Sequence, residues 1–282
     1  MVSRRTIVAA AAGAAALLGV VGAVAAASAS TATVLVTSTT YWDVYSTATW
    51  YAANGATLAP LLPYLDDYTT QIGTDFGYSV FPLPGGQAKL ALVLDPAITN
   101  AASTGTPLGL EGVTVAANTV GEVWDSIAGY LYYIFSLHET VNDWTGALAS
   151  GWPWADGSSL WAGTSPFPTA CDIIITEELG YTAISEAHRA EESSDQGVQL
   201  FLNLQSTYGW AAFRQFFALV SKNGITNWTA YPEPLRTAII AWFFTQTTGV
   251  DQLDNFNAAV LADSGQTIPL TTYEQAQSMF PS

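Results

Sequence analysis

His138 and Glu139 are adjacent residues in a stretch whose apolar residues recur at helical spacing. Residues four apart on a helix share a face, so His138 and Asn142 can point at one spot. Glu139 lies about 100° further round the helix and can reach a water molecule bound at that spot. The pattern predicts a metal site on a helix, with Glu139 as an adjacent general base.

A carboxylate from a second helix, expected at about residues 170–192, would complete this site. Helical spacing places one set of its residues on a shared face: Ile174, Glu177, Tyr181, Ile184 and His188. A carboxylate on an apolar face needs a partner, because burying it unpaired is costly. We therefore expect Glu177 to face inward and to converge with His138 across a cleft. Glu178 remains open as the alternative ligand, and a plain ion pair of Glu177 with Arg189 remains open too.

The segment from His138 to Gly146 resembles the His-Glu-x-x-His-x-Trp-x-Gly motif of gluzincin aminopeptidases, with Trp144 and Gly146 in register. Asn142 stands where that family has its second metal histidine, and an amide oxygen is a weak zinc ligand. Residues 208–256 are similar to the helical lobe of enhancin-like peptidases.

This resemblance implies a zincin metallopeptidase that cleaves a protein or glycoprotein substrate. It implies Zn²⁺ held by His138, Asn142 and Glu177, with Glu139 as the catalytic base. The alternative is a catalytically inactive zincin-like module that acts in extracellular binding or at the cell surface. A glycosidase with paired carboxylates is a third interpretation, but no two acidic residues stand out for it.

The elements that must position these residues follow from the same patterns. Strands are expected at 33–37, 89–94 and 112–116, with a helix at 58–72. The motif helix is expected to run from Val120 to Gly146. Shorter helices are expected at 196–206, 208–221, 233–248, 251–262 and 271–279. The expected fold class is α+β and zincin-like: a small mixed sheet lobe, the active-site helix and a mainly helical C-terminal lobe.

Three segments are expected along the chain. Residues 1–29 are typical of a signal peptide, with Arg4 and Arg5 before an apolar run and small residues at its end. Residues 30–150 are expected to form the N-terminal lobe and residues 151–282 the C-terminal lobe. The leader predicts a secreted protein. An uncleaved N-terminal anchor remains open, because the apolar run is long enough to span a bilayer.

Charge excludes some partners. The chain has 23 acidic residues against seven lysines and arginines, for a net charge of −16. This balance excludes nucleic-acid binding through a basic patch and disfavours an anionic membrane surface. No membrane contact is therefore expected beyond the export signal, and the oligomeric state is not predicted.

Three residue types have a plainer structural interpretation beside a functional one. Cys171 is the only cysteine and is expected to be a small buried residue. His188 is expected to lie at a helix end, where the dipole favours it. Four tryptophans around the loop after the motif helix could line a cleft, but core packing is favoured for them: Trp144, Trp152, Trp154 and Trp161.

Overall fold

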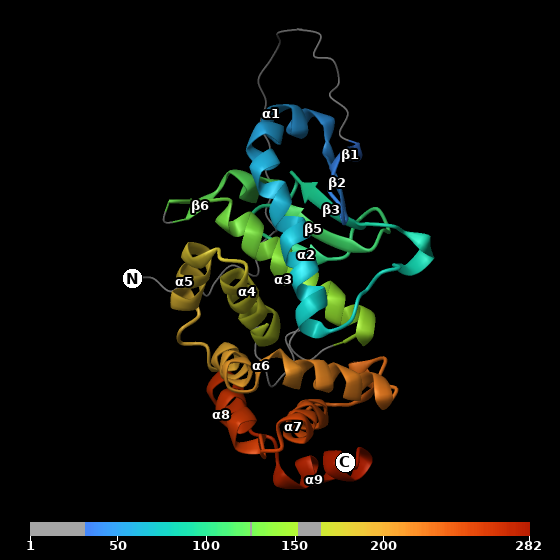
Figure 1. The fold of residues 1–282 in the computed structure, drawn as a ribbon, viewed down its shortest axis with the longest axis vertical. Helices are drawn as coiled ribbons and strands as arrows, with labels where there is room; N and C mark the ends of the chain where they lie inside the picture. Colours follow the sequence, from blue (N-terminus) through green and yellow to red (C-terminus); the bar gives the residue numbers. More distant parts are fainter. Residues whose placement is uncertain (1–31, 125, 152–164) are drawn as a thin grey trace, which may run out of the picture.

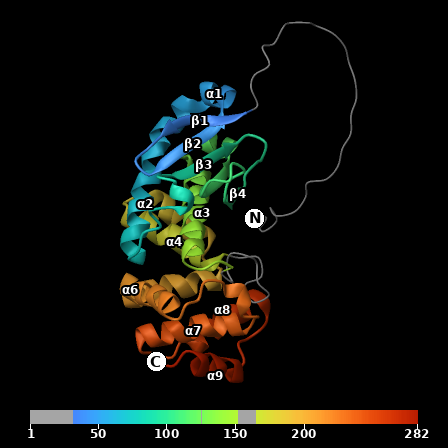
Figure 2. The ribbon, with the colours of Figure 1, turned by 90° about the vertical axis from the view of Figure 1, so that its right-hand side faces the viewer.

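The structure is a computed structural model that describes residues 32–124, 126–151 and 165–282. Figure 1 shows a sheet lobe with helices α1, α2 and α3 beside the strands, and below it a lobe built from helices α6 to α9. The view in Figure 2 shows the same two-part arrangement from the side. The expected signal peptide and three of the four tryptophans, Trp152, Trp154 and Trp161, lie outside the described residues.

A five-stranded mixed sheet forms the centre of the upper lobe. Its strands are β1 (Thr33–Ser38), β2 (Trp42–Thr47), β3 (Leu90–Asp95), β4 (Ala102–Thr104) and β5 (Gly112–Ala116). The strand order is β1-β2-β3-β5-β4. Strands β2, β3 and β5 run parallel, and the outer strands β1 and β4 pair antiparallel to their neighbours.

The prediction of a small mixed sheet is confirmed, as are the three expected strands. The central strands β3 and β5 are buried along nearly their whole length, which explains the continuous apolar run of β3 and the mainly apolar sequence of β5. Gly112 begins β5 at a φ of 143°, and a Cβ there would lie 2.0 Å from the carbonyl oxygen of Ala91. The close approach of β3 and β5 therefore requires glycine at this position.

The upper lobe also contains helices α1 (Ala48–Leu58), α2 (Leu62–Phe76) and α3 (Tyr130–Leu148), with 3-10 turns at Ala59–Leu61, Pro84–Gly86 and Ala117–Gly121. A short hairpin of β6 (Val123–Trp124) and β7 (Ile127–Ala128) precedes α3. The expectation that α3 begins at Val120 is wrong. The apolar residues of the hairpin happen to follow helical spacing, so the sequence pattern did not separate the hairpin from the helix. Gly129, at a φ of 74°, ends the hairpin and precedes the first residue of α3.

Two helices, α4 (Pro166–Glu178) and α5 (Thr182–Glu191), replace the single helix expected at 170–192. Gly180 separates them and has a φ of 82°, a left-handed conformation that interrupts a helix. The two helices therefore present different faces, and helical spacing cannot be counted from Glu177 on α4 to His188 on α5.

The remainder of the chain is mainly helical, as predicted. It contains α6 (Gln196–Lys222), a 3-10 turn (Trp228–Ala230), α7 (Leu235–Thr248), α8 (Leu253–Ser264) and α9 (Leu270–Met279). Helix α6 covers two of the expected helices, and its one non-helical residue, Gly209, lies close to the expected boundary. In the described part of the chain, no helix combines the length and apolar character that crossing a bilayer requires.

Candidate functional site

Helix α3 packs against β5 and β4 of the sheet and against α4 on another side. Its buried face includes Leu137, Val141 and Trp144. The Trp144 indole donates a hydrogen bond to the carbonyl oxygen of Tyr78 at 3.4 Å, and the Tyr78 hydroxyl donates to the carbonyl oxygen of Trp144 at 3.2 Å. Core packing is therefore confirmed for Trp144. Gly146 is exposed, and α3 continues past it to Leu148.

The acidic partner of His138 is Asp172 on α4. His138 Nδ1 lies 2.9 Å from Asp172 Oδ2, and the Asp172 side chain is fully buried. A carboxylate accepts, so Nδ1 carries the proton and Nε2 is left as the outer nitrogen of the ring. The His138 side chain is 20% exposed, and Nε2 has no hydrogen-bond partner among the described residues.

Burial and charge act in opposite directions on this pair. Burial lowers the pKa of His138, but the charge and hydrogen bond of Asp172, together with Glu139, raise it above the ordinary value of 6.5. Burial raises the pKa of Asp172 to about 6, and His138 opposes that rise. Asp172 therefore both orients the ring and favours its protonated form.

Glu139 faces the sheet edge. Thr104 Oγ1 on β4 donates a hydrogen bond to Glu139 Oε2 at 2.7 Å. One turn further along α3, burial raises the pKa of Asp143 to about 7, and the charges of Glu111 and Glu139 raise it as well. We call these three carboxylates the β4 rim: Glu111, Glu139 and Asp143. The predicted base is thus positioned by an edge strand.

Asn142 lies one turn after His138 on α3. Its Oδ1 atom is buried and has no hydrogen-bond partner in the part of the chain that the structure describes. An unpartnered buried carbonyl oxygen is costly, so this amide is a polar group with an unused acceptor.

The expectation that Glu177 faces inward is wrong. Its side chain is 59% exposed and its Oε2 atom accepts a hydrogen bond from Arg189 at 2.6 Å, so the plain ion pair is confirmed. Glu178 also binds elsewhere: it accepts hydrogen bonds from Trp210 at 2.8 Å and from Gln71 at 3.1 Å. The structure brings neither glutamate to His138.

Sequence reasoning missed Asp172, although a signal was present. Asp172 precedes three isoleucines, Ile173–Ile175, in a helix that is buried continuously from Ala170 to Thr176. The argument that an acid among apolar residues needs a partner applies to Asp172 more strongly than to Glu177. The error came from counting helical spacing across Gly180.

His188 lies in the last turn of α5, as expected, but it is buried. Its Nδ1 atom has no hydrogen-bond partner among the described residues. Its ring meets that of Tyr130 edge to face at 6.4 Å. Burial, followed by the charge of His138, lowers the pKa of His188 to about 3. His188 is therefore neutral in the folded chain and is not held by a favourable helix-end charge.

Cys171 is buried, as expected, and burial raises the pKa of its thiol well above the ordinary value. A thiolate nucleophile needs the opposite shift. The structure thus gives no support to a role for Cys171 in catalysis.

Zinc is the metal that the sequence resemblance implies. A zinc centre takes three or four protein ligands, chiefly thiolate, imidazole and carboxylate. Among the described residues, no group of three His, Cys, Asp or Glu side chains could hold a metal ion. His138 Nε2 and Asn142 Oδ1 are the available donors of the motif, and Glu177 is engaged with Arg189. The described residues of the motif therefore provide two of the three or more ligands that a zinc centre requires.

No protein-family model, no curated protein and no solved structure matches this chain.

Proposed function

We propose that this protein is an exported zincin-like module that binds an extended, basic polypeptide along strand β4 without hydrolysing it. The observation that carries the proposal is the hydrogen bond from Thr104 on β4 to Glu139 on α3. It joins the acidic residue of the motif to an edge of the sheet. Export rests on the leader expected at residues 1–29.

The first support is the open edge of the sheet. Strand β4 is the last strand in the sheet order and pairs with β5 on one side. Ser103 and Thr104 on this strand are exposed. An edge strand presents unpaired backbone groups that can pair with one more strand, and an extended polypeptide supplies the matching groups.

The second support is charge. Glu111, Glu139 and Asp143 form the β4 rim, and their mutual repulsion contributes to the raised pKa of Asp143. A lysine or arginine side chain at this rim would relieve that repulsion. The net charge of −16 would also increase the association rate of a basic partner.

His138 has a positioning role in this proposal. Asp172 holds its Nδ1 atom, and the ring therefore presents Nε2 in one fixed orientation. A ring nitrogen held in this way can donate a hydrogen bond to a peptide carbonyl when His138 is protonated. The charge and hydrogen bond of Asp172 raise the pKa of His138, which widens the pH range in which that form is present.

A zinc peptidase is the second candidate, favoured by one specific observation. A carboxylate on one ring nitrogen, which leaves the other nitrogen outward, is how proteins commonly hold a metal-binding histidine. Asp172 and His138 have this arrangement, and Asn142 Oδ1 is a buried acceptor one turn away. The second candidate predicts cleavage of the bound polypeptide, whereas the first predicts that it stays intact.

The experiment uses the purified full chain and a fluorescent short peptide that alternates threonine and lysine, with fluorescence anisotropy as the measurement. A peptide that alternates threonine and glutamate controls for charge. The lysine peptide methylated at alternate backbone amides controls for strand pairing. We expect only the unmodified lysine peptide to bind, and the paired change Glu139→Gln with Asp143→Asn to weaken binding by about tenfold or more.

Equal binding of the methylated peptide would contradict pairing along β4. Mass spectrometry of the same mixtures tests the second candidate. Cleavage of the peptide by the unchanged chain, lost in Glu139→Gln, would contradict the binding function and support a peptidase.

A further inference from the structure

A groove lies between α6 and α8 in the lower lobe, away from α3. Its cavity has a volume of about 230 Å³. Eleven residues line it, from the N-terminal half of α6, the residue before α8 and the first turns of α8: Gln196, Gln199, Leu200, Asn203, Leu204, Thr207, Tyr208, Gln252, Asn255, Ala258 and Ala259. We call this the α6–α8 groove.

The lining is neutral and rich in amides. Five of its residues are glutamine or asparagine, two are hydroxyl residues, and none is Lys, Arg, His, Asp or Glu. The chain has a net charge of −16, but no charged side chain lines this groove. An ionic ligand would lose water there without gaining a counter-charge, so the lining favours a neutral ligand.

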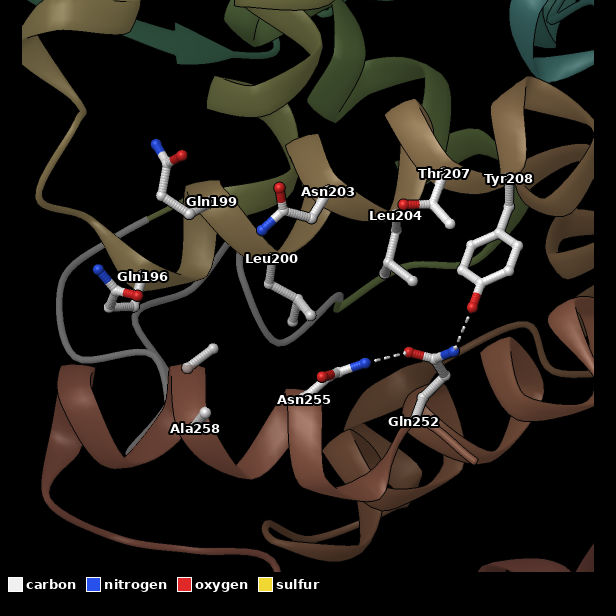
Figure 3. Close-up of a pocket in the computed structure, with 11 residues that line it drawn as sticks. Gln196, Gln199, Leu200, Asn203, Leu204, Thr207, Tyr208, Gln252, Asn255 and Ala258 are labelled. Carbon is white, nitrogen blue, oxygen red and sulfur yellow. Dashed lines mark hydrogen bonds between the residues drawn. The ribbon is translucent and has the colours of Figure 1, made fainter. Parts of the chain in front are cut away.

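One end of the groove is built and fixed by hydrogen bonds. Gln252 is fully buried, and its amide nitrogen donates to Thr248 at 3.1 Å and to the carbonyl oxygen of Val250 at 3.2 Å, with a longer contact to the Tyr208 hydroxyl at 3.5 Å. Its amide oxygen accepts a hydrogen bond from Asn255 at 2.8 Å. Figure 3 shows this chain of contacts from Asn255 through Gln252 to the Tyr208 hydroxyl. The Tyr208 hydroxyl accepts there and keeps its own proton to donate.

Gln199 donates to the carbonyl oxygen of Glu192 at 3.4 Å, but other polar groups of the groove are unused. The side chains of Asn203 and Thr207 and the Oδ1 atom of Asn255 have no hydrogen-bond partner in the described part of the chain. Asn203 and Thr207 lie one turn apart on α6, so their donors and acceptors are about 6 Å apart along the axis. Between the polar groups, Leu200 and Leu204 point from α6 toward α8.

We propose that the α6–α8 groove binds a neutral sugar ring. Side-chain amides place a donor beside an acceptor, which matches neighbouring sugar hydroxyls that each donate and accept. The apolar C–H face of the ring would lie on Leu200 and Leu204, and Tyr208 would close the fixed end. A polypeptide fits less well, because the groove offers helix side chains and no strand edge. This site does not rest on the proposed polypeptide binding at β4.

The test is saturation-transfer-difference NMR on the purified full chain with glucose, galactose, mannose and N-acetylglucosamine. Glucuronic acid serves as the charged control. We expect at least one neutral sugar to bind saturably and glucuronic acid to bind more weakly. Asn203→Leu should weaken sugar binding by about tenfold, because it removes the amide from an exposed position without disturbing the core.

Gln205→Leu is the matched control, since Gln205 lies on the same helix but outside the groove lining. It should bind the sugar as the unchanged chain does. The proposal is overturned if no neutral sugar binds, if Asn203→Leu binds as tightly as the unchanged chain, or if both leucine variants lose binding equally.

Discussion

Asp172 accepts a hydrogen bond from His138, and its carboxylate is fully buried, so water does not compete for this acceptor. We predict that Asp172→Asn lowers the pKa of His138, because the negative charge that raises it is removed while burial remains. The ring-proton shifts of His138, followed by NMR across pH, measure this change. We also expect a loss of about 1–3 kcal/mol in the free energy of unfolding, because Asp172 is a buried hydrogen-bond acceptor.

Glu177→Gln is the control for that prediction. Glu177 is exposed, and among the described residues its side chain pairs with Arg189 alone. Its loss should therefore change stability by no more than about 0.5 kcal/mol and leave the titration of His138 in place. If Glu177→Gln shifts the titration of His138 and Asp172→Asn does not, the acidic partner has been assigned wrongly.

At the scale of elements, Gly129 fixes where α3 begins. It has a φ of 74°, and a Cβ added to it would lie 2.7 Å from a methyl carbon of the buried Leu61. Gly129→Ala should therefore combine backbone strain of about 1 kcal/mol with overpacking of about 1–3 kcal/mol. Gly265→Ala is the control. Gly265 has a φ of 71° and no atom within 4 Å of its Cβ position, so this change should cost the backbone strain alone.

Urea unfolding of the two variants measures this difference. Gly129→Ala should unfold at clearly lower urea than Gly265→Ala. Equal losses would mean that the start of α3 does not depend on the fit between Gly129 and Leu61.

The elements that sequence predicted well are those with a single dominant signal. Strand β5 lies at 112–116 as expected, because three consecutive β-branched residues, Val113, Thr114 and Val115, favour a strand. The prediction failed where two structures share one pattern: Val123 and Ile127 fit a helix by spacing but form a hairpin. Strand β2 was missed although its burial alternates, because its polar and aromatic residues gave no apolar run.

The site was partly predictable for the same reason. His138 and Glu139 stand out because their chemistry is local to one helix. Asp172 lies 34 residues from His138, and their contact depends on how α4 packs against α3. Helical spacing predicts which residues share a face of one helix, but it does not predict how two helices pack together. The inward position of Glu177 was predicted from one continuous helix, whereas the chain has a break at Gly180.

Across the whole molecule, buried carboxyl groups link stability to pH. Asp75 on α2 is buried beside Glu178 of α4 and accepts hydrogen bonds from Gln71 at 3.1 Å. Burial, with the nearby carboxylate of Glu178, raises its pKa to about 8, and Arg214 opposes that rise. The folded chain therefore holds a proton on Asp75 that the unfolded chain releases at its ordinary value of 3.8.

We predict from this that the contribution of Asp75 to stability is fully present at low pH and is lost as the pH rises from about 4 to about 8. His188 has the opposite effect on stability. Its pKa is lowered from the ordinary value of 6.5 in the folded chain, so stability falls as the pH drops below about 6.5. The Asp75→Asn variant isolates the first effect. Thermal unfolding across this pH range should show a flatter profile for Asp75→Asn than for the unchanged chain.

The exposed Asp254 provides the control, and Asp254→Asn should keep the original profile. A profile for Asp75→Asn that matches that of the unchanged chain would rule out Asp75 as a source of the pH dependence.

Calorimetric titration of the purified full chain with Zn²⁺ tests most directly whether His138 and Glu139 on α3 belong to a zinc centre. We predict no stoichiometric binding by the unchanged chain. Asn142→His should gain measurable affinity, because it places a second imidazole on the His138 face of α3. One tightly held zinc ion per unchanged chain, lost in His138→Ala, would contradict this account and establish a metal centre.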